Sequence, residues 1–346
     1  MKQLPSWKIR EASIDDLEAI RDLYFKVWGF NRPKTFEYWR YATPPLGFCP
    51  IAVAVDSNRL VGAYTVWPVQ IRVGHNVFPG AQSIDTMTHP DYLGQGIFTQ
   101  LANECYRITR ERGYKLLYGF PNPLSYPGFV KNLGWSHTGD ITHWIRLIKP
   151  SLHLQVPNIG RPILDMMTSL LPKGSTAGFN IRLEKPNESE LSVLLDQWRS
   201  KGDACMIEKS SGWLSWRYAP DAENNYRWVS VYKDGNLLAA GVWGKQSTAW
   251  GDAADNRAHL VDLFGENFNA LKAVLAVVIK EATAENTMVL ETLCNLDRIC
   301  KVLRRVGFYK HRAAPFIVKK LDDTLFEPDP LKHSSWCIIG SDVDTF

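Results

Sequence analysis

The sequence repeats itself, and the repeat limits the chain to two copies of one folding unit. Phe36–Tyr41 returns as Trp213–Tyr218, with the same Trp-Arg-Tyr ending at an offset of 177 residues. Further segments match in the same order: Ile51–Val55 with Trp228–Tyr232, Leu60–Ala63 with Leu237–Ala240, Ser83–Asp85 with Leu260–Asp262, and, at a slightly smaller offset, Leu133–Trp135 with Val306–Phe308. Because several matches keep one register, we interpret the chain as two tandem copies of an α/β unit of roughly 150 residues.

Hydrophobic periodicity predicts the same order of elements in each copy. In the first copy the expected strands are Trp7–Ala12, Ile51–Val55, Leu60–Val73, Gln82–His89, Lys115–Phe120 and Thr138–Ile148. The expected helices cover residues 17–27, Thr35–Ala42, Gln95–Arg112 and a short segment Tyr126–Asn132. We therefore expect a first domain at 1–150, a linker at 151–177 and a second domain with a C-terminal tail at 178–346.

Composition and charge exclude several classes of protein. The 346 residues are 45% hydrophobic and 22% charged, which is typical of globular domains, and the net charge is only +4. A charge this small does not predict a nucleic-acid or membrane partner. The six cysteines form no C-x-x-C pair, so neither a disulfide framework nor a metal site is expected. With no signal-peptide profile and no apolar run long enough to span a bilayer, we expect a cytoplasmic protein; a homo-oligomer is left open.

The segment between the predicted strand Gln82–His89 and the following helix is the most informative part of the chain. It contains Gly94 and Gly96, separated by Gln95, directly before the helix. Glycines let consecutive backbone N–H groups converge without a Cβ atom in the way, and a helix N-terminus adds a favourable dipole. This pattern predicts an anion site suited to a pyrophosphate, although a tight strand-to-helix turn would give the same pattern. A dinucleotide fingerprint is excluded because Thr99 stands where the third glycine would be.

The segment His89–Phe98 resembles motif A of the GNAT acyltransferase superfamily, usually written Q/R-x-x-G-x-G/A. Leu93 replaces the first Gln or Arg and Phe98 replaces the final small residue, while Gly96 keeps the central glycine. Downstream, Gly119–Tyr126 and Lys131–Trp135 resemble motif B, with Val130 where a tyrosine is usual. The resemblance covers about residues 7–148 strongly and 178–320 weakly. It is greatest to the tandem-GNAT acyltransferases of amino sugars, especially nucleotide-linked sugars for surface polysaccharide.

The resemblance implies a fold and a cosubstrate. Each copy would form a mixed, mostly antiparallel central sheet flanked by helices, and the first would bind acyl-CoA, with acetyl-CoA or a longer acyl-CoA as the donor. The implied acyl-CoA-binding residues are Met87, Thr88, Leu93, Gly94, Gln95, Gly96, Ile97, Phe98, Asn122 and Ser125. Pantetheine would run along the strand near Met87–Thr88, whose N–H groups would stabilise the oxyanion. The second copy has Leu271–Ala273 at the matching offset, without glycines, so we expect it to be degenerate and to have lost acyl-CoA binding.

Three residues are the main candidates for proton transfer, and Ser125 is a fourth. Asp85 or His89 would act as the base that deprotonates the amine, and Tyr126 would protonate the leaving thiolate, with Ser125 as an alternative. Each has a structural alternative. Asp262 occupies the register of Asp85 in the second copy, which favours a shared structural hydrogen bond; His89 can be a solvent-facing strand end, and Tyr126 a packing residue.

The sequence therefore predicts an acyl-CoA-dependent N-acyltransferase whose acceptor is a small-molecule amine, most specifically a nucleotide-linked amino sugar. Three alternatives stay open: an N-acetyltransferase of another small amine, a degenerate CoA-binding sensor or scaffold, and an enzyme that uses aminoacyl-tRNA. The mild charge argues against the last, because tRNA recognition usually requires a strongly basic surface.

Overall fold

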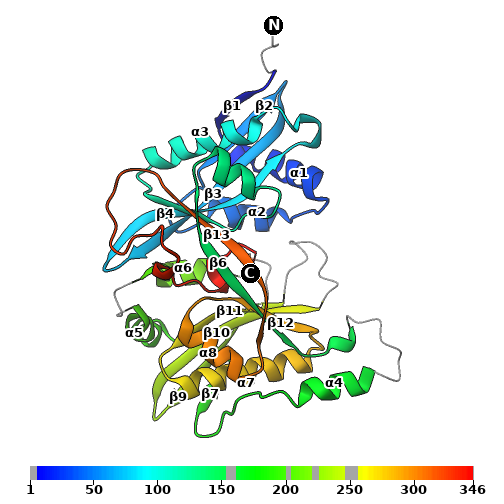
Figure 1. Cartoon of the computed structure of the whole chain (residues 1–346), viewed down its shortest axis with the longest axis vertical. Coiled ribbons are helices and arrows are strands. Elements are labelled where there is room, and N and C mark those ends of the chain that lie inside the picture. The colour runs from blue at the N-terminus through cyan, green and yellow to red at the C-terminus, as the bar shows by residue number, and fades with distance from the viewer. Residues whose placement is uncertain (1–5, 153–160, 200–203, 220–225, 246–255, 346) are drawn as a thin grey trace. The chain divides into compact units, whose positions relative to one another are not determined.

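The computed structural model describes residues 6–152, 161–199, 204–219, 226–245 and 256–345 (Figure 1). The chain forms two compact units. The first comprises Met1–Asp140, Asp203–Glu223 and Pro315–Trp336, and the second comprises Ile141–Gly202, Asn224–Ala314 and Cys337–Phe346.

The sheet of the first unit is mostly antiparallel. Its strands follow the order β1 (Lys8–Glu11), β2 (Ile51–Asp56), β3 (Arg59–Val73), β4 (Asn76–Thr88), β5 (Leu116–Gly119) and β13 (Tyr309–Lys320). Only β4 and β5 pair in parallel. A short strand, β8 (Cys205–Ile207), pairs with the end of β3. The mixed α/β architecture predicted from the sequence is confirmed.

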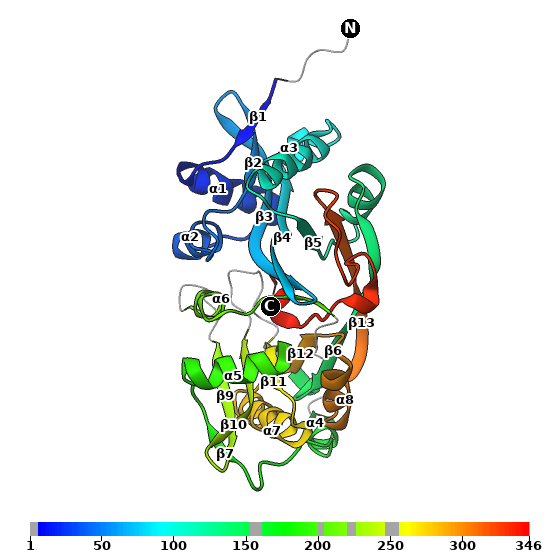
Figure 2. The same ribbon diagram turned by 90° about the vertical axis from the view of Figure 1, so that its left-hand side faces the viewer.

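Helices cover both faces of this sheet (Figure 2). Helices α1 (Leu17–Trp28) and α2 (Lys34–Ala42) lie on one face, and α3 (Ile97–Glu111) lies on the other. The apolar stripe predicted for α3 is buried and faces the core: Ile97, Leu101, Cys105 and Ile108 are all at most 2% exposed. A further short helix, α6 (Ser211–Arg217), belongs to the same unit.

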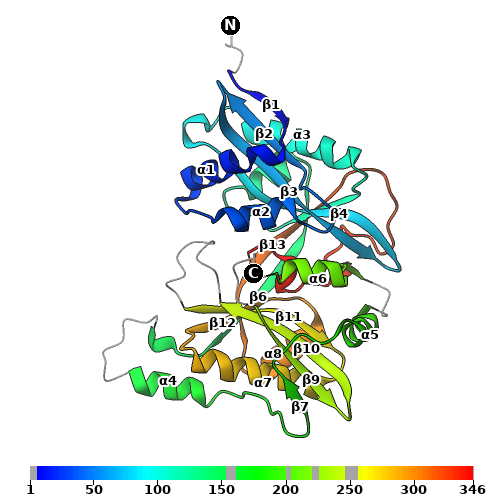
Figure 3. The ribbon, with the colours of Figure 1, turned by 180° about the vertical axis from the view of Figure 1, so that it is seen from behind.

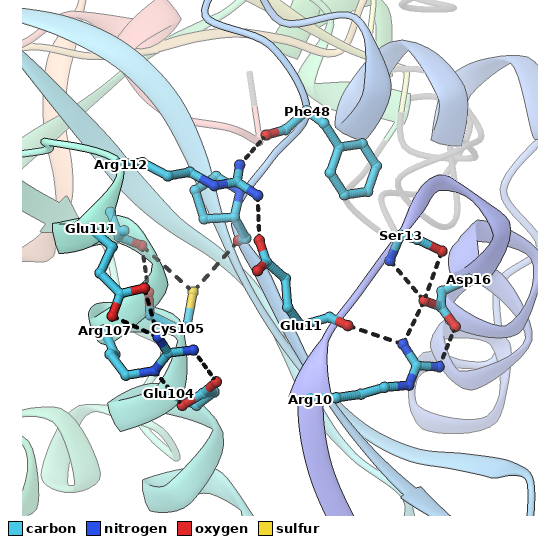
Figure 4. Close-up of polar contacts among 12 residues, drawn as sticks. Arg10, Glu11, Ser13, Asp16, Phe48, Glu104, Cys105, Arg107, Glu111 and Arg112 are labelled. Carbon is cyan, nitrogen blue, oxygen red and sulfur yellow. Dashed lines mark hydrogen bonds and ion pairs between the residues drawn. The ribbon is translucent and has the colours of Figure 1, made fainter.

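The C-terminal end of α3 is linked to neighbouring segments by polar contacts (Figure 4). Arg112 donates a 2.8 Å hydrogen bond to the carbonyl oxygen of Phe48 and pairs with the Glu11 carboxylate. Arg107 bridges two glutamates of the same helix. Exposed ion pairs of this kind are each worth under about 1 kcal/mol, so the buried stripe, rather than these pairs, fixes the position of the helix.

The second unit repeats the same plan. Its sheet follows the order β6 (Ser136–Leu147), β12 (Val289–Leu293), β11 (Arg257–Gly265), β10 (Asn236–Lys245), β9 (Arg227–Lys233) and β7 (Asn180–Arg182). Helix α7 (Phe268–Ala284) packs on β9, β10 and β11 and forms the main core with them (Figure 3). The remaining helices are α4 (Arg161–Ser169), α5 (Glu188–Arg199) and α8 (Asp297–Arg305).

The last strand of each copy completes the sheet of the other unit. Strand β6 follows β5 along the chain but pairs with β12, where Leu147 lies opposite Val289. Strand β13 follows β12 along the chain but pairs with β5, where Ile317 lies opposite Gly119. The two compact units are therefore interleaved along the sequence, whereas the boundaries at 150 and 178 delimit the sequence repeats and stay a prediction.

The repeated Trp-Arg-Tyr segments pack against each other within the first unit. The Trp39 indole N–H donates to the Trp216 carbonyl oxygen at 2.8 Å, and the Trp216 indole N–H donates to the Trp39 carbonyl oxygen at 3.3 Å. The two rings stack with centroids 5.2 Å apart. Because each tryptophan satisfies the backbone of its own counterpart, this contact gives a physical reason for the presence of the motif in both copies.

One local expectation needs correction. Leu271–Ala273, which the sequence comparison aligned with the glycine loop, lies inside helix α7, and Leu271 and Ala273 are fully buried. The predicted helical segment Tyr126–Asn132 is helical over these residues, and its part Gly128–Asn132 is a π-helix. Across the described part of the chain, no helix combines the length and the apolarity needed to cross a membrane.

Candidate active site

The loop between β4 and α3 presents open backbone N–H groups. A 3₁₀ turn at Pro90–Tyr92 leads into Gly94 and Gly96, whose φ angles are +75° and +78°. Gly96 is the N-cap of α3, and no side chain caps this helix. The amide groups of Gly94, Gln95 and Gly96 donate to no protein acceptor among the described residues. The loop therefore has the unsatisfied donors of an anion site at a helix N-terminus.

Side chains at both ends hold this loop. The Tyr92 hydroxyl donates to Asp56 at 2.8 Å, and the Trp7 indole donates to the Gln95 side chain at 3.2 Å. His89 is only 6% exposed; its Nδ1 accepts from the Asp91 amide, and its Nε2 contacts Arg59. These contacts make His89 part of the loop scaffold and not a solvent-facing residue.

The bulky Phe98 points away from the loop and into the core. A Cβ atom on Gly128 would lie 2.7 Å from the Phe98 ring, so this glycine provides the space that the ring occupies. The ring also packs edge-on against Phe129, with centroids 5.4 Å apart, and near Tyr64. Phe98, which replaces the usual small residue, therefore packs the start of α3 against Gly128–Asn132.

Strands β4 and β5 separate next to this loop. They pair from Gly80 opposite Leu116 to Ser83 opposite Gly119, and β4 then continues alone on that side to Thr88. The other edge of β4 stays paired with β3, where Met87 lies opposite Ala63 and Thr88 opposite Gly62. The free edge beside Met87 and Thr88 is where the resemblance places pantetheine.

Asp85 is fixed by three side chains on the α1/α2 side of the sheet. It lies at a β-bulge with φ of +40°. Arg32 donates to both carboxylate oxygens at 3.0 and 3.1 Å, and Arg40 and Tyr41 donate at 2.6 and 2.7 Å. Burial alone would raise the pKa of Asp85, but the guanidinium groups of Arg32 and Arg40 outweigh burial and hold it well below its usual range. A carboxylate bound in this way is an anchor and is poorly suited to act as a base.

Sequence reasoning missed Glu37, which belongs to the same cluster. Its carboxylate lies 3.7 Å from Arg32, its side chain is 3% exposed, and burial raises its pKa to about 7. The available signal was an acid on the buried stripe of α2, between Phe36 and Trp39. Leu214 occupies the same position in the second copy.

Tyr126 and Asn122 lie on the other side of the sheet from this cluster. Tyr126 packs against the core that contains α3 and Phe98, and its hydroxyl makes no hydrogen bond within the described part of the chain. The Asn122 side-chain oxygen accepts from the amides of Leu124 and Ser125 at 3.0 and 2.9 Å, which shapes the turn before Tyr126. The structure thus packs Tyr126 against the core beside Ile97 and Phe98, at the start of α3, and separates it from Asp85.

The second copy has no equivalent loop. Only Glu266 and Asn267 connect β11 to α7. The Asn267 side chain caps α7 by accepting from the amides of Asn269 and Ala270 at 3.0 and 2.9 Å. These donors are therefore used within the protein, unlike those of the first copy. Among the described residues, no cluster of His, Cys, Asp or Glu is placed to hold a metal ion.

Comparison with known proteins decides the family of the first copy. Residues 8–138 match a family model described as an acetyltransferase (GNAT) domain. Residues 8–138 form a GNAT domain. Together with the fold, this match supports an acyl-CoA N-acyltransferase. No curated protein sequence matches the chain.

Solved structures extend the similarity to both copies. A probable N-acyltransferase from Enterococcus faecalis V583 has a TM-score of 0.64 at 11% identity, over 92% of this chain and 73% of that one. A tandem GNAT protein from the clavulanic acid biosynthesis pathway has a TM-score of 0.61 at 14% identity, over 92% and 100%. A glucosamine N-acetyltransferase region of a fungal multi-domain β-N-acetylglucosaminidase has a TM-score of 0.60 at 15% identity, over 91% and 38%. At these identities the similarity establishes the fold of two GNAT-like units.

Proposed function

We propose that the chain is a cytoplasmic acyl-CoA-dependent N-acyltransferase that acylates an amino sugar, most specifically a nucleotide-linked one used in surface polysaccharide. The observation that carries the proposal is the set of open N–H groups at Gly94–Gly96 in the GNAT domain. The resemblance to tandem sugar acyltransferases supports the acceptor class, and one structural relative is a glucosamine N-acetyltransferase region.

In this proposal the first copy alone binds the donor. The amides of Leu93–Phe98 hold the pyrophosphate, and the free edge of β4 at Met87–Thr88 holds the pantetheine arm and supplies N–H donors to the oxyanion. The acceptor nitrogen forms the new C–N bond, the C–S bond breaks, and the proton that the amine releases passes through solvent to restore the acid that protonates the thiolate. We assign to the Tyr126 hydroxyl the proton that the departing thiolate takes up, because its ring packs beside the start of α3 and its hydroxyl has no hydrogen-bond partner among the described residues. Asn122 and Ser125 shape the turn that positions it.

The direct experiment is a thiol-release assay. Purified full-length chain is mixed with acetyl-CoA or longer acyl-CoAs and with a panel of amines that includes nucleotide-linked amino sugars, free glucosamine and small non-sugar amines. The proposal expects acylation of an amino sugar in preference to the other amines. Acylation of a non-sugar amine alone would retain the enzyme class and reject the acceptor. Tight CoA binding without transfer to any amine would indicate a sensor or scaffold instead.

A further inference from the structure

The second unit contains a gap between β11 and β12 that corresponds to the donor slot of the first. The two strands pair only from Arg257 opposite Val289 to His259 opposite Glu291, as β4 and β5 pair only as far as Ser83 and Gly119. Beyond these pairs the strands separate. The C-terminal residues Ile338–Val343, here called the tail segment, enter this gap in the second unit.

On the β12 side, Ile338 and Ile339 of the tail segment bond like an added strand, and Gly340–Asp342 then form a 3₁₀ turn. The Asn295 amide donates to the Ile338 carbonyl oxygen at 3.2 Å, and the Ile338 amide donates to the Asn295 side-chain oxygen at 2.8 Å. Ile339 forms an antiparallel bridge with Cys294. Main-chain pairing at an open strand edge is a recurrent mode of peptide recognition.

On the β11 side, the tail segment lies directly on the backbone. A Cβ atom on Gly340 would lie 3.1 Å from the carbonyl oxygens of both Leu260 and Val261, so a side chain there would require this backbone to shift by a few tenths of an ångström. The Ser341 hydroxyl donates to Asp262 at 2.7 Å. All six residues of the tail segment are buried. The tail segment therefore contacts both the β11 side and the β12 side of the gap.

The contacted positions border the matching gap of the first copy: Leu260–Asp262 match Ser83–Asp85, and Asn295 matches Asn122 of the implied acyl-CoA-binding residues. Asn295 lies four residues beyond Glu291, and Asn122 lies four residues beyond Tyr118. The register pair His259–Glu291 matches the pair Gln82–Tyr118. Pantetheine and a peptide both carry amide groups that can bond to an open strand edge, so one type of slot suits both.

We propose that the gap between β11 and β12 is a binding site for a short peptide segment, and that the tail segment occupies this gap, which corresponds to the donor slot of the first copy. The equivalence with pantetheine rests on the proposed donor site, whereas the peptide site itself rests on the contacts of the tail. Because Asn267 caps α7, this slot lacks the anion site that would let acyl-CoA displace the peptide. The chain thus carries one thioester site and one peptide site.

Hydrogen exchange in the full-length chain tests this site. The amides of Ile338 and Asn295 should exchange slowly, and saturating CoA should leave them slow. The substitution Gly340→Val should accelerate both at least a hundredfold, while Thr345→Ala, at an exposed position of the same tail, should not. Ser341→Ala is a milder variant that retains the fold and should accelerate exchange several-fold. Fast exchange of both amides in the wild-type chain would overturn the proposal, as would their release by CoA.

A synthetic peptide of residues 336–345 provides the second test. Added to the Gly340→Val chain, it should restore slow exchange at Asn295, and the same peptide carrying Gly340→Val should not. A folded variant chain that fails to bind the wild-type peptide would refute the peptide site. Donor binding is measured separately at the Gly94–Gly96 amides, so failure of CoA to protect those amides would refute the proposed function and leave the peptide site standing.

Discussion

The two copies share the order of their strands and a helix packed on the central sheet, yet differ in where their backbone donors are used. In the first copy the amides before α3 have no side-chain cap, whereas in the second Asn267 caps α7. The gap beside β4 remains an open edge of the sheet in the first unit, whereas the tail segment fills the gap beside β11 in the second. Because both copies keep a GNAT-like sheet, we infer that the sheet is required for folding. Donor binding depends instead on a few main-chain N–H groups that remain unpaired.

The largest effect should come from Asp85→Asn. Removing the carboxylate leaves the buried Arg32 and Arg40 without their charge partner, which typically costs about 3–5 kcal/mol. Urea unfolding should show this loss, and Asp15→Asn, at an exposed position, should show almost none. A variant with full stability and no turnover would instead identify Asp85 as the base.

The next largest effect is the pH dependence of stability that Glu37 causes. It is specific to the first copy, because Leu214 stands at the matching position of the second. Between pH 4.5 and about 7 the folded chain keeps a proton on Glu37 that the unfolded chain has released, so stability falls as pH rises through this window. The fall from this residue should approach about 3 kcal/mol. The free energy of unfolding, measured at several pH values, should therefore vary less with pH in Glu37→Gln than in the wild-type chain. Equal pH dependence in the two proteins would contradict the raised pKa of Glu37.

Tyr126→Phe should reduce turnover without affecting the fold. General acid catalysis typically contributes about 10²–10⁴-fold, and we expect a loss of about a hundredfold in kcat. Affinity for CoA should not change, because the ring keeps its place in the α3 core. An unchanged kcat would show that a group other than Tyr126 protonates the leaving thiolate.

A comparison of two glycines separates backbone strain from loss of the anion site. Gly96 and Gly235 have φ angles of +78° and +79°, and a Cβ atom added to either residue would meet no other atom within 4 Å. Replacing either by Ala should cost about 1–2 kcal/mol of stability. Only Gly96→Ala should also weaken CoA binding, by about tenfold, as measured by calorimetry. Equal CoA affinity in the two variants would refute the role of the loop.

Much of this fold could be predicted from local patterns. The repeat, the stripe of α3 and the Gly94–Gly96 turn are encoded by neighbouring residues, and the structure contains all three. The exchange of β6 and β13 could not be predicted, because strand pairing depends on distant segments and both strands have ordinary β-forming sequences.

The candidate site was predictable only in part, for related reasons. The open amides follow from two glycines, but the partners of Asp85 come from residues 44 to 53 positions away. The raised pKa of Glu37 depends on burial, which periodicity indicates only for apolar residues. The sequence predicted a C-terminal tail but not where it packs, because its contacts with Leu260 and Val261 join segments that are far apart along the chain.

The most direct test of the account is a calorimetric titration of the full-length chain with CoA. The account predicts one molecule bound per chain, with binding lost when both Gly94 and Gly96 are replaced by Val and retained when Gly235 is replaced. Two molecules per chain, or unchanged binding in the Gly94 and Gly96 double variant, would contradict the claim that only the first copy holds the donor.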